Sequence, residues 1–201
     1  MSQPSAPRIP AGRCIHCWLR TDFCICSTIE PRTIRTDLVL LRHWREARKP
    51  SNTGRIARLA IPEIQIHDYG DPSISFSRDD LGVEGAHLLM PDPHPDKAPS
   101  LQSVERLIIP DGTWGQSRRM CTRLGLNDLP KIHLPLPRAD TIRLRKPPGP
   151  WAMSTLEALA MALHQTESIE LGEHLLALHE RFVRASRAQR GLSIPDSTPI
   201  D

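Results

Sequence analysis

The chain has 201 residues, of which 39% are hydrophobic and 24% are charged. This composition excludes a wholly disordered chain and predicts a packed globular protein, either one α/β domain or a domain with a small appendage. The net charge of +3 is too small to require a nucleic-acid partner. Arginines gather in the stretches RRMCTR and RADTIRLRK, which fit a phosphate-binding surface and a solvated basic surface equally well.

The two ends of the chain are predicted to lie outside the folded body. Residues 1 to 12 are rich in Pro and Ser and should be disordered, and residues 191 to 201 should form a flexible tail. The first residues contain no apolar signal segment, and no window approaches the roughly 20 apolar residues that span a bilayer. We therefore expect no membrane partner and a cytoplasmic location, and we expect a monomer.

Four cysteines lie together in the segment of residues 13 to 30. Cys14 and Cys17 form a C-x-x-C pair, and Cys24 and Cys26 form a C-x-C pair. In a reducing compartment this pattern favours a metal over disulfides, and four thiolates would close the tetrahedral coordination of a structural zinc. A thiol–disulfide switch, unliganded buried cysteines and His16 in place of one sulfur are the alternatives.

The body, residues 31 to 190, alternates short apolar runs with segments of helical periodicity. Strands are predicted at 37–41, 63–67, 86–91, 104–110 and 131–136, and helices at 52–60, 114–125, 154–167 and 169–190. This alternation predicts an α/β fold with a mainly parallel sheet and flanking helices.

Three polar segments follow predicted strands or open predicted helices. They are RHWREARKPSNTGR after the first strand, PDGTWGQSRR after the strand at 104–110, and STLEA at the start of the apolar helix. Ligands of open α/β sheets usually bind in the crevice at the carboxyl ends of the strands. The three segments could therefore converge on one pocket that contains Asp111.

Each segment also has a purely structural interpretation. Ser154 and Glu157 fit the S-x-x-E capping box, and Asp111 opens an Asp-Gly dipeptide that is typical of a turn. Residues 52 to 54 fit a helix N-cap and a tight turn, although free amides at a helix start also attract a carboxylate or a phosphate. The sequence has no G-x-G-x-x-G after a strand, no Walker loop and no G-x-S-x-G elbow. Redox, nucleotide-hydrolysing and serine-hydrolase chemistry are therefore unsupported.

The ordered set C-x-x-C, C-x-C, NTGR, D-x-T-W at residues 111 to 114 and STLEA resembles the DTW-domain family over residues 13 to 185. The resemblance implies a catalytic domain over residues 31 to 190 with a SPOUT-like α/β fold, with or without a knot. It also implies transfer of the 3-amino-3-carboxypropyl group of S-adenosylmethionine to N3 of a uridine in the variable loop of tRNA. Methylthioadenosine would be released.

The resemblance suggests a role for each polar segment. Asp111 is the candidate general base for uridine N3, with Glu157 as the alternative base. Trp114 could pack on adenine or uracil, and the amides around Thr53 and Gly54 could hold the methionine carboxylate of the donor. The other candidates for binding S-adenosylmethionine are Asn52, Thr113, Ser154 and Thr155, and those for binding tRNA are His43, Glu46, Arg118, Arg119 and Arg123.

One segment departs from the family pattern, which usually has H-P-x-E where this chain has His43-Trp44-Arg45-Glu46. The loss of proline removes a constraint on φ, so the path of this loop cannot be taken over from the family. Two other functions stay open at this point. A sulfonium donor could instead give methyl transfer to RNA, and a noncatalytic zinc-containing RNA-binding module would need no acid at position 111.

Overall fold

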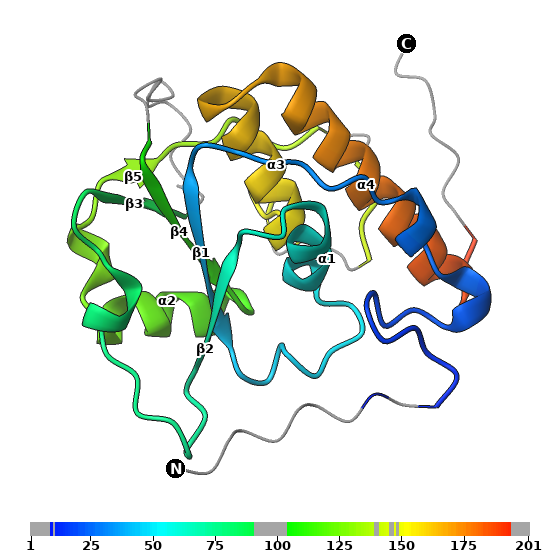
Figure 1. The fold of residues 1–201 in the computed structure, drawn as a ribbon, viewed down its shortest axis with the longest axis horizontal. Coiled ribbons are helices and arrows are strands. Elements are labelled where there is room, and N and C mark those ends of the chain that lie inside the picture. The colour runs from blue at the N-terminus through cyan, green and yellow to red at the C-terminus, as the bar shows by residue number, and fades with distance from the viewer. Residues whose placement is uncertain are drawn as a thin grey trace.

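The computed structural model describes residues 9, 11–90, 104–138, 141–144, 147 and 149–193. The predicted disordered stretches, 1 to 12 and 191 to 201, lie for the most part outside the described residues. The described residues contain a five-stranded sheet in the order β2-β1-β4-β3-β5, in which every pair of neighbouring strands is parallel (Figure 1). The predicted α/β class with a parallel sheet and flanking helices is confirmed.

The predicted strands and helices all occur. The strands are β1 (Asp37–His43), β2 (Gln65–Tyr69), β3 (Ala86–Leu89), β4 (Arg106–Asp111) and β5 (Lys131–Ile132). The α-helices are α1 (Thr53–Ala60), α2 (Trp114–Arg123), α3 (Thr155–Thr166) and α4 (Ile169–Ala188), and the short 3-10 helices are η1 (Thr21–Phe23), η2 (Cys26–Thr28), η3 (Asp79–Leu81) and η4 (Leu126–Asp128). Strand β5 is much shorter than predicted, since among the described strands it pairs with β3 alone and Pro135 can donate no ladder hydrogen bond.

Alternate residues of the central strands face two different layers of helix. Leu38 and Leu40 of β1 belong to the core that α1, α3 and α4 cover. Val39 and Leu41 belong to a second core with Met120 of α2. This alternation is the period of two that a strand imposes, and it explains why β1 and β4 are apolar on both faces.

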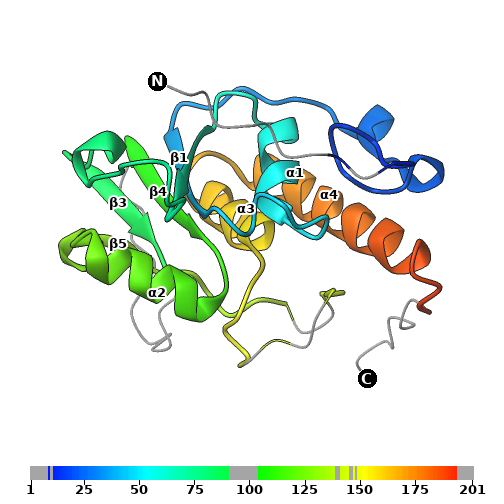
Figure 2. The ribbon, with the colours of Figure 1, turned by 90° about the horizontal axis from the view of Figure 1, so that it is seen from below.

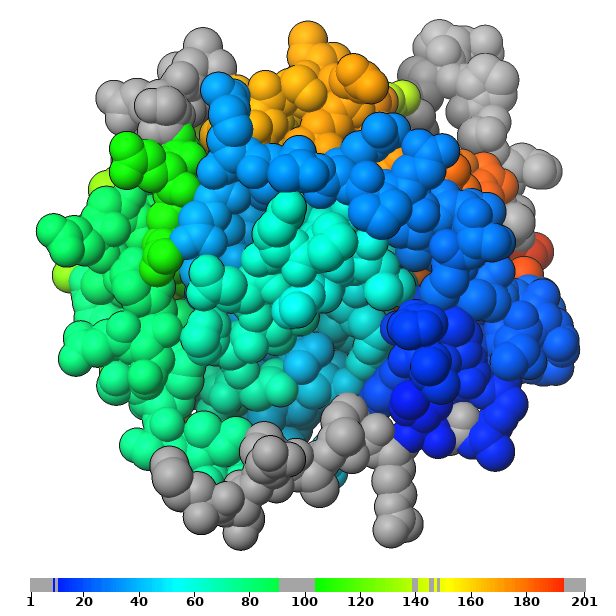
Figure 3. Space-filling model, viewed as in Figure 1, coloured from blue at the N-terminus to red at the C-terminus, as the bar shows by residue number. Residues whose placement is uncertain are grey.

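The cysteine segment packs onto the same body. Cys17, Leu19 and Ile25 are buried in the core that α1, α3 and α4 share. The backbone N–H of Arg20 donates to Oε1 of Gln189 at the end of α4, at 3.0 Å. Figure 3 shows this segment, in dark blue, lying against the surface formed by α1 and its neighbours.

The parallel strands bring their carboxyl ends to one edge of the sheet. This edge is at the bottom of Figure 1 and faces the viewer in Figure 2. There β1 and β4 are neighbours, with Arg42 opposite Asp111. No helix among the described residues is both long and apolar enough to cross a membrane.

Candidate active site

Asp111, the last residue of β4, joins three segments that are far apart in the sequence. Its side chain is buried, with the residue only 4% exposed. Its Oδ2 accepts a hydrogen bond from Nδ2 of Asn52 at 2.7 Å, and its Oδ1 accepts one from the hydroxyl of Thr155 at 2.6 Å. Asn52 precedes α1 and Thr155 begins α3. One carboxylate therefore ties the starts of two helices to the end of the central strand.

Gly54 allows α1 to approach this carboxylate. A Cβ at this position would lie 2.7 Å from Oδ2 of Asp111 and 2.7 Å from Cδ2 of Leu40. The amide of Leu156 in α3 also donates to Oγ1 of Thr53, at 3.3 Å. The NTG sequence thus serves close packing between α1, β4 and α3.

All three helices that begin here are capped by their own residues. Asn52 accepts from the amide of Arg55, Thr113 forms a capping box with Gln116, and Ser154 forms one with Glu157. The capping box predicted at Ser154 is therefore confirmed. Because the positive ends of three helix dipoles meet at this edge, they stabilise negative charge there, and the carboxylate of Asp111 lies beside them.

The three segments surround a cavity of about 280 Å³. This is near the lower limit for a small-molecule site. Eight of the residues singled out in the sequence line it: Glu46, Asn52, Thr53, Asp111, Thr113, Trp114, Ser154 and Thr155. A smaller hollow of about 50 Å³ at the ends of β3 and β4 shares Trp114 and Thr155 with it. The ring of Trp114 meets that of Trp151 edge to face, with centroids 4.4 Å apart.

Burial raises the pKa of Asp111 above its ordinary value. The hydrogen bonds from Thr155 and Asn52 and the charge of Arg42 act in the opposite direction. Desolvation is the larger effect, so this carboxylate is a stronger base than an exposed aspartate.

Glu157, the alternative base, does not line the cavity that contains Asp111. It is 1% exposed, its Oε1 accepts from a terminal nitrogen of Arg143 at 2.7 Å, and its Oε2 accepts from the amide of Ser154 at 3.2 Å. Both oxygens are therefore engaged in a helix cap and an ion pair.

Among the lining residues that were not singled out in the sequence, Arg143 and His179 carry ionisable side chains. His179 of α4 is 2% exposed, and burial lowers its pKa, so its imidazole is neutral at neutral pH. Its position beside Leu178 on the buried face of α4 was the only available signal. Arg143 lies in the stretch RADTIRLRK, and nothing in the sequence distinguishes it from the other arginines of this stretch.

The loop after β1 follows a series of tight turns. The amide of Trp44 donates to the carbonyl of Tyr69 at 3.0 Å, which extends the β1–β2 pairing and which a proline could not do. The guanidinium carbons of Arg45 and Arg48 each lie 5.4 Å from the centroid of the Trp44 ring. The loop thus holds two cations against one aromatic ring, and Glu46 between them in the sequence lines the cavity.

Of the residues that were assigned to tRNA binding, only Glu46 lines the cavity. Nδ1 of His43 accepts from the amide of Arg45 at 3.3 Å and lies 3.4 Å from Nε2 of Gln116, and burial lowers the pKa of His43. Glu46 at the cavity wall pairs with Lys49 at 2.5 Å. The three arginines of α2 are exposed and, within the described ranges, form no ion pair: Arg118, Arg119 and Arg123.

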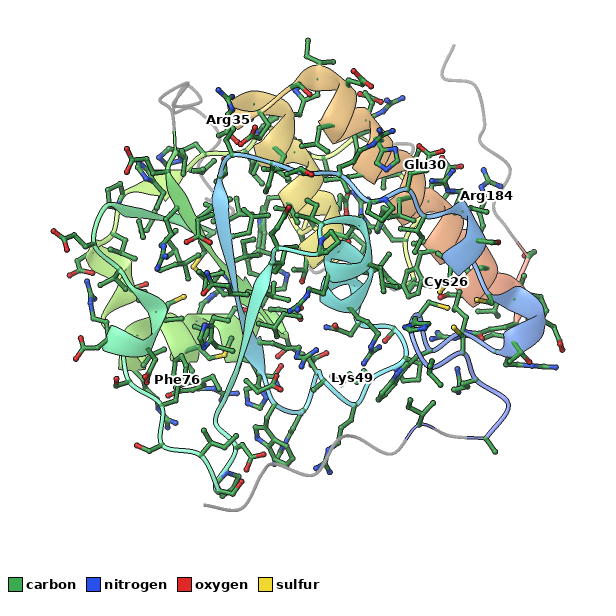
Figure 4. The ribbon with its side chains drawn as sticks, viewed as in Figure 1. Cys26, Glu30, Arg35, Lys49, Phe76 and Arg184 are labelled. Atoms are coloured by element: carbon green, nitrogen blue, oxygen red, sulfur yellow. The ribbon has the colours of Figure 1, made fainter. Side chains whose placement is uncertain are left out.

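The four cysteines form a separate centre beside α4, where Figure 4 shows sulfur atoms around Cys26. Their Sγ atoms all lie within 4.8 Å of one another, with 3.6 Å between Cys14 and Cys26 and 3.8 Å between Cys17 and Cys24. Zn–S bonds of about 2.3 Å in a tetrahedron separate sulfurs by about 3.8 Å, so the geometry fits zinc. His16 does not belong to the set of grouped ligands among the described residues.

The acidity of these thiols fits the same interpretation. Burial and the neighbouring sulfurs raise the pKa of Cys26, because several thiolates cannot share so small a volume without a cation. Burial acts in the same direction on Cys14, but hydrogen bonds from the backbone of Cys17 and His16 lower its pKa to about 6. A divalent metal would stabilise all four as thiolates.

Arg55 connects the cysteine segment to the loop that carries Glu46 and Asn52. Its guanidinium carbon lies 3.8 Å from the centroid of the Trp18 ring. It also donates to the carbonyl oxygens of Lys49 at 3.0 Å and Ala47 at 2.6 Å. Burial lowers the pKa of Arg55 to about 10, which is still high enough to keep the charge.

A family model described as DTW domain matches residues 11–187. No solved structure matches the chain.

The cysteine centre predicts about one zinc per chain by metal analysis of the purified protein. Cys24→Ser should lower both the metal content and the melting temperature, because it opens the coordination sphere. Cys121→Ala is the matched control, since Cys121 is buried on the other side of the sheet and should leave the metal content unchanged. Well-folded wild-type protein that contains no metal would contradict the assignment.

Proposed function

Because this chain belongs to the DTW-domain family, we propose that it transfers the 3-amino-3-carboxypropyl group of S-adenosylmethionine to N3 of a uridine in the variable loop of tRNA. The family is consistent with a tRNA-modifying transferase, and the transferred group and the acceptor atom are part of the proposal. The observation that carries it is the buried carboxylate of Asp111 in the cavity where α1, α2 and α3 begin.

The proposed reaction is one displacement. Uridine N3 attacks the methylene carbon of the aminocarboxypropyl chain that is bonded to the sulfonium. The N3–C bond forms as the C–S bond breaks, and the electron pair of the broken bond stays on sulfur, which leaves as methylthioadenosine. The N3 proton passes to Asp111, whose raised pKa makes it a better base than its ordinary value of roughly 3.9 allows.

The residues around Asp111 have different proposed roles. Asn52 and Thr155 donate to the carboxylate, so they orient the base. Trp114, whose ring is supported by Trp151, offers an aromatic surface in the cavity for the adenine or the uracil. The other residues proposed to bind the donor lie at the starts of the three helices: Thr53, Gly54, Thr113 and Ser154.

The proposal extends to the fold, the metal, the tRNA surface and the oligomeric state. We propose a SPOUT-like fold, with or without a knot, and a structural zinc held by the four cysteines. The tRNA would lie over the arginines of α2, and His43 and Glu46 would contact it at the rim of the cavity. The protein would act as a monomer in the cytoplasm.

The product identifies the reaction. Purified protein, unmodified tRNA and S-adenosylmethionine are incubated, and the nucleosides are analysed by mass spectrometry. We expect aminocarboxypropyluridine together with methylthioadenosine. A methylated nucleoside would instead show a methyltransferase, and unmodified tRNA that is nevertheless bound would indicate a noncatalytic RNA-binding module.

Asp111→Asn tests the base, since it keeps the size of the side chain and removes its charge. Turnover should fall roughly 100-fold to 10,000-fold, the usual contribution of a positioned base, while S-adenosylmethionine and tRNA still bind. Wild-type turnover should rise with pH as Asp111 loses its proton, at a pKa above the ordinary aspartate value because burial raises it, and the variant should lack this rise.

Glu157→Gln is the companion variant. It breaks the ion pair with Arg143 and should lower the melting temperature. The role of base would pass to Glu157 if Glu157→Gln lost most of its turnover at unchanged melting temperature while Asp111→Asn kept nearly normal turnover.

The arginines of α2 predict the salt dependence of tRNA binding. Changing Arg118, Arg119 and Arg123 to Ala should weaken binding and reduce the slope of log K against log salt by roughly one for each phosphate that is no longer neutralised. Arg184→Ala is the control, because Arg184 is a half-buried arginine on α4, away from α2 (Figure 4), and it pairs with Glu180. An unchanged slope in the α2 variants would place the RNA elsewhere.

A further inference from the structure

The cavity contains a cationic side chain whose hydrogen bonds are incomplete. Nε of Arg143 is buried and has no acceptor in the described part of the chain. Arg143 lines the cavity, and its side chain is only 20% exposed. Because buried donors are almost always paired, this N–H indicates an acceptor that a ligand would bring.

Glu157 holds the guanidinium of Arg143 in place. One terminal nitrogen donates to Oε1 of Glu157 at 2.7 Å, and the other oxygen of Glu157 accepts from the amide of Ser154 at 3.2 Å. Glu157 is 1% exposed, so this contact is shielded from water. A guanidinium fixed in this way is preorganised for a planar anion, and a carboxylate is such an anion.

The charges in the cavity distinguish between possible anions. Besides Arg143, the lining includes the acids Asp111 and Glu46 and the buried imidazole of His179. A phosphate would meet repulsion from Asp111, whereas Glu46 is already paired with Lys49. An α-amino acid group carries a carboxylate and an ammonium, and so it matches a cavity that contains charges of both signs.

We infer that Arg143, in place of the amides around Thr53 and Gly54, binds the α-carboxylate of the 3-amino-3-carboxypropyl group of the donor. His179 can add a ring N–H to the same carboxylate. This inference rests on the proposed function and specifies it further, since it says which part of the donor the cavity recognises. Recognition of the amino acid end would place the transferred group in the cavity that contains Asp111.

Two ligands that differ in the amino acid end test the inference by calorimetry. S-Adenosylhomocysteine has the carboxylate, and methylthioadenosine has the same nucleoside thioether without the amino acid. Arg143→Gln should weaken binding of S-adenosylhomocysteine roughly 10-fold to 100-fold, the loss expected for a charge-assisted hydrogen bond, and should leave binding of methylthioadenosine within about 2-fold. Arg184→Gln, outside the cavity, should change neither.

Wild-type protein provides a test that needs no variant. Decarboxylated S-adenosylmethionine keeps the sulfonium and the ammonium, and it should bind more weakly than S-adenosylmethionine by a similar factor. The inference would be wrong if these two donors bound with equal affinity. It would also be wrong if Arg143→Gln lowered the affinities for S-adenosylhomocysteine and methylthioadenosine by the same factor, although nucleoside binding would then still stand. If Arg143→Gln weakens only tRNA, Arg143 contacts an RNA phosphate and the inference is wrong. If the wild type binds no adenosyl ligand, the proposed function itself fails.

Discussion

The candidate site depends on the hydrogen bonds that the buried carboxylate of Asp111 accepts. A carboxylate without donors would be expensive to bury, and here Asn52 and Thr155 supply them from two different helix starts. The same bonds bring α1 and α3 against the end of β4. Because each carboxylate oxygen has a second lone pair, Asp111 can still accept a proton or a further donor from a ligand. Structural and chemical roles are therefore compatible in this one group.

The same dual role explains why the polar motifs have both a capping and a functional interpretation. Oδ1 of Asn52 caps α1, while its Nδ2 reaches Asp111. Ser154 caps α3 and also lines the cavity. A helix that begins at a ligand site must satisfy its own first amides, and the residues that do so are then at the site. A capping pattern at a strand end is thus weak evidence against function.

Much of the fold follows from local pattern, because apolar runs and capping residues act over a few positions. The sequence predicts that Asp111, Asn52 and Thr155 lie close together, because the carboxyl ends of parallel strands meet at one edge of the sheet. Arg143 and His179 could not, because their roles depend on contacts between the loop before α3 and a face of α4. The need for Gly54 was equally hidden, since it comes from the distance between α1 and Asp111. The short β5 shows that an apolar run at a sheet edge becomes a strand only as far as its neighbour pairs with it and no proline interrupts it.

The contact between Arg55 and Trp18 bears on the order in which the chain assembles. Both residues, the four cysteines, β1 and α1 lie in the first third of the sequence, so these contacts span short stretches of chain. Contacts that close short loops form early, whereas those of Asp111 with Thr155 must wait for residues synthesised much later. The contact between Arg55 and Trp18 would therefore form early in synthesis, whereas the pocket, which also contains His179, would be completed only with α4.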